Sequence, residues 1–409
     1  MTLDLAYVRS CFPALDTPWA LMDNAGGSVT ARSVIDRVTE YMSRYQMQIG
    51  ASYSLSQQAE VQVRAGEAAA TELIGASVEE TIVGPSTTAN LQTLARALAP
   101  TMQAGDEVVV TDLDHESNIG CWLRLAERGI VIKTWRVRPQ TARLELEDLE
   151  GLLGPRTKLV TFTHCANVVG EIVDVAAVAA CVREHSDALS CADGVAFAPH
   201  RLVDVGSLGV DFYALSLYKV YGPHLGVLWG KREHLVAAKG QNHEFIAETQ
   251  VPYKFQPGNV THELAAGLPG IVEYFEGLAT HHGIEGVTVR ERLAGVFERI
   301  AAHEAQLAER LLAFLREHPR VRIIGPEQAD PARRVPTIAF VVDGVSSRAV
   351  ASAVDEAEVA IRYGHFYAKR AIEAMALTES EGVARVSMVH YNTLEEVDRL
   401  IAALTARLR

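Results

Sequence analysis

A lysine follows an apolar run in the stretch Val210-Asp211-Phe212-Tyr213-Ala214-Leu215-Ser216-Leu217-Tyr218-Lys219. The run Val210–Leu215 is typical of a strand buried on both faces, because its apolar residues are consecutive rather than alternating. A lysine just beyond such a strand loses solvation, which lowers its pKa and makes the free amine available as a nucleophile. Most lysines are simply solvated surface residues. A reactive role for Lys219 therefore needs further evidence from other residues.

Six further strands alternate with helical patterns between residues 80 and 231, and several of them are likewise apolar on consecutive residues. The strands are predicted at Glu80–Val83, Glu107–Thr111, Ile130–Val137, Lys158–Thr163, Ala188–Ala192 and Leu225–Trp229. Helical periodicity fills the gaps at Ala89–Leu98, Asn118–Arg128, Leu144–Leu153 and Val175–Glu184. This alternation predicts an α/β fold with a mostly parallel seven-stranded sheet and helices on both faces. Ligands of such sheets bind beyond the carboxyl ends of the strands.

The chain beyond residue 289 has a different pattern, typical of a smaller α+β domain. Helices are predicted at residues 289–317, 346–357 and 394–408, and strands at 320–324, 335–342 and 384–388. We expect a large domain over residues 20–275 and a small domain formed by residues 1–19 and 276–409. Residues 238–261 are expected to form a long functional loop.

Composition and charge exclude several classes of protein. The 409 residues include 38 basic and 51 acidic ones, a net charge of −13, with no long basic run. Neither a nucleic-acid partner nor an anionic membrane is therefore expected. The five cysteines form no CxxC pair, the amino terminus has no signal-peptide pattern, and no 18 apolar residues run uninterrupted. These features predict a reduced cytoplasmic protein.

The common motifs of nucleotide binding, serine hydrolysis and zinc proteolysis are absent. The sequence contains no GxGxxG, GxxxxGK[ST], GxSxG or HExxH, and His243-Glu244 and His262-Glu263 each lack the second histidine of a zinc helix. No metal site is therefore predicted.

Polar residues instead stand where the predicted strands end. Ser86-Thr87-Thr88 lies between a strand and a helix, where hydroxyls and free backbone N–H groups make a phosphate cradle. An ordinary helix cap is the alternative reading. Asp193 follows another strand, either to pair with a cationic ligand or to cap a turn. Together with Lys219 these residues supply a phosphate site, a cation partner and a reactive amine, which is the set that pyridoxal phosphate requires.

With these residues in place, the sequence resembles the class V aminotransferase group of fold-type I pyridoxal phosphate enzymes, and within it the cysteine desulfurase and selenocysteine lyase branch. The resemblance runs from Leu21-Met22-Asp23-Asn24-Ala25-Gly26-Gly27 to Arg385-Val386-Ser387 and Tyr391-Asn392-Thr393. It implies a small domain packed on a large cofactor-binding domain, and an amino-acid substrate.

The resemblance also implies roles for single residues. Lys219 would carry the cofactor and His115 would stack on its ring, and both are the implied catalytic residues. The remaining implied cofactor contacts are Thr87, Thr88, Asn167, Asp193, Ser216, Tyr218 and Asn259, the last of these in the partner subunit. The implied substrate contacts are Arg385 for the α-carboxylate, together with Asn24, His365 and Tyr367.

The sequence departs from the desulfurase pattern at the loop that reads Arg362-Tyr363-Gly364-His365-Phe366-Tyr367. Desulfurases of this branch have a cysteine where this chain has Tyr367, and a phenol cannot accept sulfur as a thiolate does. Cys165 is the one plausible substitute, although a small buried apolar residue is its simpler role. Ala196 replaces a glutamine, Tyr218 a histidine and Asn259 a threonine, which indicates a divergent subgroup.

Three functions are compatible with these residues. The first is β-elimination from a sulfur- or selenium-bearing amino acid, in which Lys219 takes the Cα proton and Tyr367, His365 or His115 acts as the acid. The second is transamination or epimerisation within the same class. The third is a cofactor-binding protein without catalysis, which the joint presence of Lys219, Asp193 and Arg385 disfavours. The resemblance further implies a homodimer in which the segment 254–262 reaches the neighbouring active site.

Overall fold

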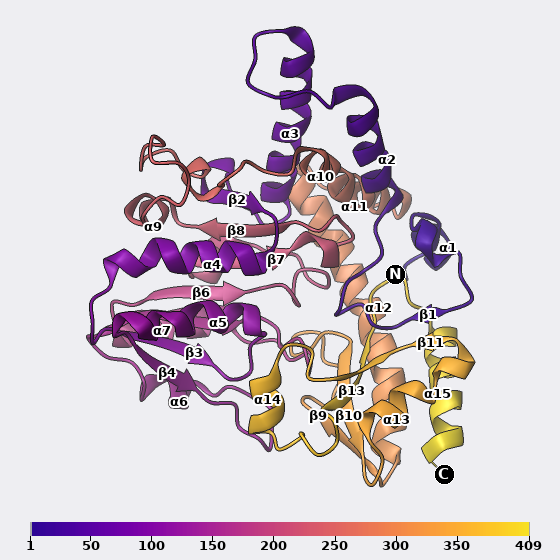
Figure 1. Ribbon diagram of the computed structural model, residues 1–409. Coiled ribbons are helices and arrows are strands. Elements are labelled where there is room, and N and C mark those ends of the chain that lie inside the picture. The colour runs from indigo at the N-terminus through magenta and orange to yellow at the C-terminus, as the bar shows by residue number, and fades with distance from the viewer. Residues whose placement is uncertain (1, 409) are drawn as a thin grey trace.

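The computed structural model describes residues 2–408, and a seven-stranded sheet lies at its centre (Figure 1). Its strands are β2 (Thr81–Gly84), β3 (Glu107–Thr111), β4 (Val131–Trp135), β5 (Thr157–Thr163), β6 (Leu189–Asp193), β7 (Phe212–Ser216) and β8 (Gly226–Gly230). Their order is β2-β8-β7-β6-β5-β3-β4, and β8 alone runs antiparallel to its neighbours. The predicted mostly parallel sheet is confirmed.

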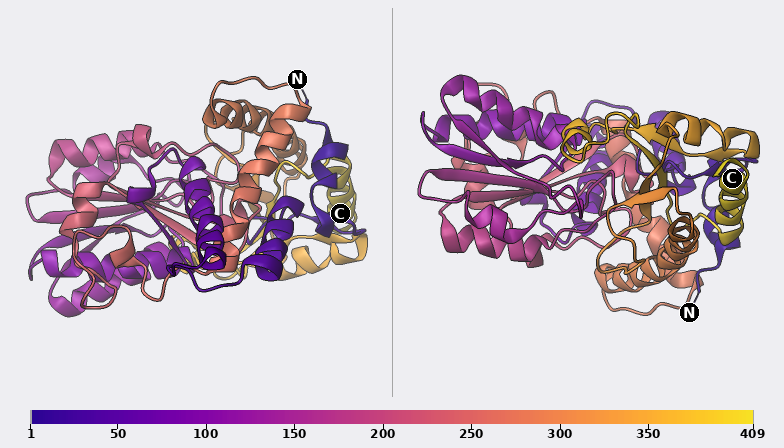
Figure 2. Two further views of the ribbon diagram at one scale, coloured as in Figure 1. Left: turned by 90° about the horizontal axis from the view of Figure 1, so that it is seen from above. Right: turned by 90° about the horizontal axis from the view of Figure 1, so that it is seen from below.

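Both faces of this sheet are covered by helices, as Figure 2 shows. Val108 and Val110 of β3 pack on one side in a cluster with residues of α4 (Thr87–Leu98) and α5 (Gly120–Leu123). Val109, between them, packs on the other side in a cluster with residues of α7 (Val175–His185). Burial of successive side chains on opposite faces explains why the strands read as unbroken apolar runs.

The helices of the large sheet are shorter than the periodicity suggested in two places. The pattern at 118–128 gives the four-residue α5 and then a 3-10 helix, Arg124–Arg128, which ends at Gly129 with a φ of 81°. The pattern at 144–153 gives only α6 (Leu146–Glu150). The other helices before residue 290 are α1 (Leu5–Ser10), α2 (Arg32–Glu40), α3 (Ser54–Glu72), α8 (Val205–Leu208), α9 (Arg232–Ala237), α10 (His262–Gly267) and α11 (Pro269–His281).

A second sheet lies in the carboxyl-terminal part of the chain. It is antiparallel with the order β12-β13-β10-β9, formed by β9 (Val321–Ile324), β10 (Thr337–Val342), β12 (Arg362–Gly364) and β13 (Val383–Ser387). The helices of this part are α12 (Val289–Glu317), α13 (Ser347–Ser352), α14 (Lys369–Ala374) and α15 (Leu394–Leu408). The α12 and α15 predictions are exact, whereas α13 ends five residues before the predicted 357 and a 3-10 turn follows it.

The amino-terminal segment runs along this second sheet. Strand β1 (Ala20–Leu21) pairs in parallel with β11 (Val359–Ala360), and Asp23 forms a bridge with Ser387 at the end of β13. Residues near position 23 therefore lie beside residues near position 385. The predicted domain boundaries stay a prediction. No helix in the described residues has the length and apolar character needed to cross a membrane.

Candidate active site

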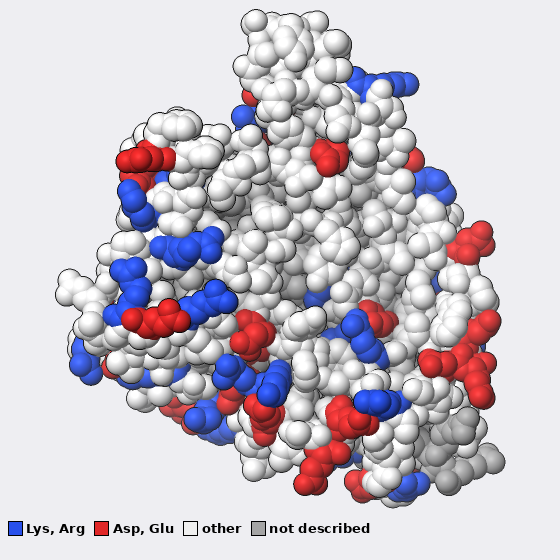
Figure 3. Space-filling model, in the orientation of Figure 1, with Lys and Arg blue, Asp and Glu red and all other residues white. Residues whose placement is uncertain are grey.

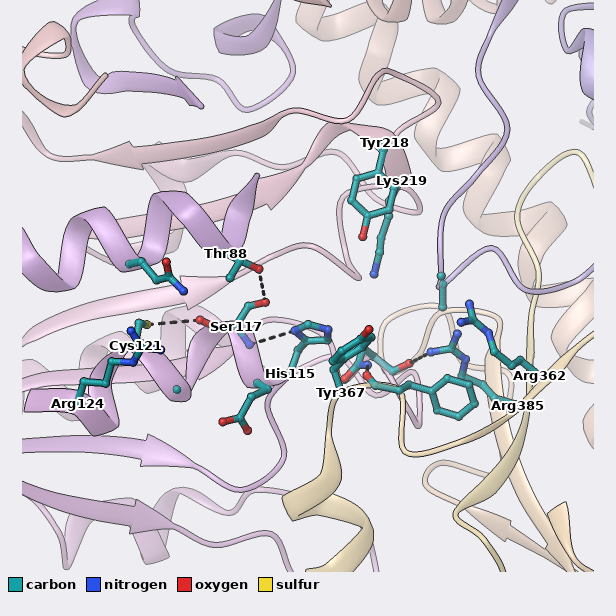
Figure 4. A pocket seen from close by; sticks show the side chains of 17 residues that line it. Thr88, His115, Ser117, Cys121, Arg124, Tyr218, Lys219, Arg362, Tyr367 and Arg385 are labelled. Carbon is teal, nitrogen blue, oxygen red and sulfur yellow. Dashed lines mark hydrogen bonds between the residues drawn. The ribbon is translucent and has the colours of Figure 1, made fainter. Parts of the chain in front are cut away.

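Two adjoining cavities, of about 520 and 100 Å³, lie at the carboxyl edge of the large sheet. Their linings share six residues, which come from four of the strand ends and are drawn in Figure 4 together with the rest of the larger cavity. The shared residues are Thr88, His115, Ser117, Asn167, Tyr218 and Lys219. Thr87, Asp193 and Ser216 line only the smaller cavity, and Arg385 and Tyr367 only the larger of these two. The structure thus brings most of the predicted site residues together.

The smaller cavity holds an amine and a carboxylate that are both removed from water. Lys219 is only 5% exposed, and its burial, reinforced by the nearby Arg385 cation, lowers the pKa of the amine to about 8. Burial raises the pKa of Asp193 to about 6, although the Val195 N–H donates to its carboxylate at 2.9 Å. A cation that reached Asp193 would favour the ionised carboxylate.

His115 is held as a neutral ring with a defined tautomer. Its Nδ1 accepts a hydrogen bond from the backbone N–H of Ser117 at 3.1 Å, so the ring proton lies on Nε2. Burial, with smaller contributions from Lys219 and Arg385, lowers the pKa of the ring to about 4. At neutral pH His115 is therefore a hydrogen-bond donor through Nε2.

The three hydroxyl groups at the start of α4 have different hydrogen-bond partners. Ser86 caps the helix by accepting from the Ala89 N–H at 3.1 Å. Thr87 donates to the Leu215 carbonyl at 2.7 Å and lies 2.7 Å from the Ser216 hydroxyl. The Thr88 hydroxyl contacts that of Ser117 at 2.6 Å and faces both cavities. The helix cap and the cradle are therefore compatible readings of the same segment.

Arg385 lies on β13 with its guanidinium group at the larger cavity. Its Nη1 donates to the Asn167 carbonyl at 3.0 Å, its Nη2 to Asp23 at 2.9 Å, and the Phe366 ring stacks 3.7 Å from its centre. Burial lowers its pKa to about 10, which leaves it charged at neutral pH. Its Nε has no partner, and neither has the side-chain oxygen of Asn167, although both atoms are buried. Unpaired buried polar atoms of this kind indicate the place of a ligand.

These residues fit pyridoxal phosphate. Thr88 and the amino terminus of α4 would hold the phosphate group, since free N–H groups and hydroxyls favour an anion there. Asp193 would pair with the ring nitrogen, Lys219 would bond the aldehyde carbon, and the unpaired Asn167 oxygen and the His115 N–H lie on the walls of the same cavities. Tyr218 lines both cavities and burial raises the pKa of its hydroxyl, which keeps it protonated as a donor.

Three of the predicted residues lie elsewhere. Asn24 lines neither cavity: its amide donates to the carbonyls of Leu21 and Ser387, and its oxygen accepts from Tyr391, so its contacts tie the amino-terminal segment to β13. Asn259, which was expected to contact the cofactor of the partner subunit, lies on an exposed loop with a φ of 66° and lines neither cavity of its own chain. His365 lines a different groove, together with Tyr363 and Gly364.

The segment 362–367, expected to be a loop, consists of β12 and the turn that follows it, and it forms one wall of the larger cavity. Phe366 and Tyr367 both have positive φ angles, 50° and 59°, which is a strained arrangement for two successive side chains. Two hydrogen bonds secure it, from the Asn167 amide to the Phe366 carbonyl at 2.9 Å and from the Glu116 N–H to the Tyr367 carbonyl at 2.7 Å. The Tyr367 ring lies 5.4 Å from the His115 ring. Tyr367 thus lines the larger cavity, and its contact with a substrate stays a prediction.

Two cysteines lie beside the cavities, one of which the sequence did not single out. Cys165 lines the smaller cavity and Cys121 the larger one. Burial raises the pKa of each thiol to about 12, so neither is a thiolate at neutral pH. The prediction that Cys165 is an inert buried residue stands as the simpler reading.

The lowered pKa of the Lys219 amine should be visible in the pH dependence of its chemical labelling. In protein freed of cofactor, trace labelling with acetic anhydride should increase as the pH rises through about 8, because the neutral amine predominates above that value. Peptide mass spectrometry reports the extent of labelling. In the unfolded protein the same lysine should titrate near 10.4, and an identical midpoint in both states would contradict the prediction.

Comparisons with known proteins show the family to which the chain belongs. The family model "Aminotransferase class-V" matches residues 20–400. The aminotransferase-like protein FGM3 of Gibberella zeae is 39% identical, with 97% of this chain and 96% of the relative covered. The cysteine desulfurase-like protein ustD of Aspergillus flavus is 33% identical over 97% of this chain and 88% of the relative. The solved apo structure of a cysteine desulfurase from Thermococcus onnurineus NA1 has a TM-score of 0.87 and 25% identity, and covers 100% of this chain and 98% of its own. These matches, and the fit of the pocket to the cofactor, show that the chain is a pyridoxal phosphate-dependent enzyme of the class V aminotransferase family.

Proposed function

We propose that this enzyme is a carbon–sulfur lyase, which eliminates a sulfur or selenium substituent from the β-carbon of an amino acid. The observation that carries the proposal is Tyr367, which lines the cavity at the position where desulfurases of this branch have their sulfur-accepting cysteine. The two cysteines at the cavities, with pKa values of about 12, are poor sulfur acceptors. The scaffold nevertheless resembles desulfurases over its whole length.

Arg385 and Lys219 would have different roles in the reaction. Arg385 would bind the α-carboxylate through the unpaired Nε and thereby place the Cα–H bond near Lys219. When bound, pyridoxal phosphate supplies an electron sink for the negative charge that develops at Cα. The Lys219 amine, with a pKa of about 8, is well matched to take the Cα proton near neutral pH.

The elimination needs a proton for the departing sulfur. The Cβ–S bond breaks with its electron pair on sulfur, and the thiol forms when that sulfur takes a proton. His115, which carries its proton on Nε2, and the Tyr367 phenol lie on the wall of the cavity and are the proposed donors. The released enamine then takes up water and yields pyruvate and ammonium, so the atoms balance as conjugate plus water to thiol, pyruvate and ammonium.

Transamination is the second candidate, because the 39% identical relative is described as aminotransferase-like. In that reaction Lys219 would return the proton to another carbon, and no leaving group would be required. The two candidates therefore differ in their products and in their need for a β-substituent.

A single assay separates them. The purified enzyme with its cofactor is incubated with L-cysteine, L-selenocysteine, S-methyl-L-cysteine, S-aryl-L-cysteines and L-alanine, with and without an added 2-oxo acid. A lyase should release pyruvate and thiol in equal amounts from the conjugates and nothing from alanine. A new amino acid formed from the 2-oxo acid, without thiol release, would contradict the lyase proposal and establish the transaminase.

We further propose a cytoplasmic homodimer with each active site at the subunit interface. The projecting end of α2 and α3, including the loop 46–53 between them, has few charged side chains, as Figure 3 shows. Several of its apolar side chains are exposed: Ile35, Met42, Met47, Tyr53, Leu55 and Val61. Exposed apolar patches of this kind are typical of subunit interfaces. Sedimentation should give twice the 44.5 kDa chain mass, and a fully active monomer would contradict the proposal.

A further inference from the structure

Two arginines of the second sheet stand directly opposite each other. Arg362 of β12 and Arg385 of β13 are partners in the antiparallel register, and both line the larger cavity. Like charges at directly opposed positions repel each other and destabilise a sheet. The pair therefore requires a compensating negative charge.

Asp23 supplies that charge and contacts both arginines. One carboxylate oxygen accepts from the Arg385 Nη2 at 2.9 Å, and the other accepts from the Arg362 Nε at 2.7 Å and lies 2.5 Å from its Nη2. Asp23 itself is 27% exposed, whereas the Arg385 side chain is 1% exposed. The carboxylate thus reaches a buried guanidinium group from the amino-terminal segment.

The backbone around Asp23 fixes the carboxylate in this position. The Ser387 N–H donates to the Met22 carbonyl at 2.7 Å, and the Asn24 N–H donates to the Ser387 carbonyl at 3.1 Å. Gly26 makes room for Arg362, since a Cβ atom there would lie 2.2 Å from the Arg362 Nη2. Asp23 is therefore held on both sides of its own position in the chain.

The contacts of Arg385 show what this arrangement leaves open. Asn167 takes the Nη1 end, Asp23 takes the Nη2 end, and the Phe366 ring covers one face. The Nε atom remains buried without a partner at the cavity. A guanidinium group anchored at both outer nitrogens has little rotational freedom, so its Nε keeps one direction.

We propose that Asp23 is a positioning residue, which aims Arg385 at the α-carboxylate of the substrate and neutralises one charge of the arginine pair. Asp23 contacts neither substrate nor cofactor in this scheme and acts through Arg385 alone. The inference rests on an α-amino-acid substrate, as in the proposed function, but not on elimination as the reaction.

The test compares two ligands that differ in a carboxylate. S-Methyl-L-cysteine and 2-(methylthio)ethylamine are titrated into the enzyme with its cofactor, and binding is followed by the visible absorption of the cofactor. Asp23→Asn should weaken binding of the amino acid by about 10- to 100-fold, as expected for the loss of charge-assisted hydrogen bonds, and change binding of the amine less than about 2-fold. Asp23→Glu, which keeps the charge but moves it, should give an intermediate loss for the amino acid only.

The control is Asp148→Asn, which breaks a surface ion pair with Arg138 of similar geometry and should affect neither ligand. Three results would overturn the proposal: tighter binding of the amino acid to Asp23→Asn, equal weakening of both ligands, or a wild-type enzyme that binds both equally. If Asp23→Asn does not fold, Asp23→Glu carries the same comparison. Absence of elimination from S-methyl-L-cysteine would count against the proposed reaction and leave this binding test intact.

Discussion

Lys219→Ala is expected to reduce turnover by about 10³-fold or more and to abolish covalent attachment of the cofactor. The variant removes the amine that would bond the aldehyde carbon and the base that would take the Cα proton, and general bases alone contribute about 10²- to 10⁴-fold. Steady-state kinetics on the best substrate of the panel measures the first effect. Borohydride reduction followed by peptide mass spectrometry measures the second.

Lys231→Gln is the matched control for this lysine. Lys231 follows β8 at the opposite edge of the sheet and pairs with Asp211 at 2.7 Å. Its removal should cost some thermal stability and leave turnover within about 2-fold, because an ion pair of this kind contributes about 1 kcal/mol or less. Substantial activity in Lys219→Ala with a normal far-UV spectrum would contradict the assignment of Lys219.

Asp193→Ala is expected to reduce turnover by about 10²- to 10³-fold. Asp193 is fully enclosed, and its charge would keep the ring nitrogen of the cofactor protonated, so its loss breaks a buried ion pair whose rupture costs roughly 3–5 kcal/mol. The fall should be mainly in kcat, because the phosphate contacts at α4 and the bond to Lys219 remain. Kinetics at saturating cofactor gives the measurement.

The control for Asp193 is Asp211→Asn, which removes a carboxylate paired with Lys231 at the opposite edge. The Asp211 carboxylate also accepts a hydrogen bond from the Ser190 N–H at 2.8 Å. The variant should therefore melt at a lower temperature but have normal turnover once folded. If turnover fell by the same factor in both variants, the effect of Asp193→Ala would reflect damage to the sheet rather than to the cofactor site.

The sequence predicts the large sheet well because most of its strands, although not β4 at the edge, are buried on both faces. Strand ends such as Asp193 and Ser216 are then placed at one edge by topology alone, which is why most of the residues predicted to hold the cofactor line the same cavity. Helix α3 was not predicted, because its buried face consists of small residues that give a weak apolar signal. A Cβ at Gly66 would lie only 1.9 Å from the Ala265 carbonyl, so its packing depends on close backbone approach.

The substrate half of the site was harder to predict. Asp23 was quoted as part of a motif, but its contact with Arg385 joins positions 362 residues apart, which no local pattern reports. Asn24 was expected to face the substrate, and its amide instead binds the carbonyls of Leu21 and Ser387. Gly26 offered a signal, since a glycine permits the close approach of another group, here the Arg362 side chain.

The position of Asp23 also bears on how the enzyme is made. The predicted cofactor contacts at the edge of the large sheet all lie between Thr87 and Lys219. The last strand of that sheet ends at Gly230. Asp23 leaves the ribosome among the first residues, whereas its partners Arg362 and Arg385 are synthesised much later. Their ion pairs can therefore form only near the end of synthesis. A polypeptide interrupted between β8 and β12 would therefore hold the groups that attach the cofactor while lacking those that orient an amino acid. In the proposed scheme, binding of the amino acid therefore requires the last stage of synthesis, in which the two ends of the chain meet.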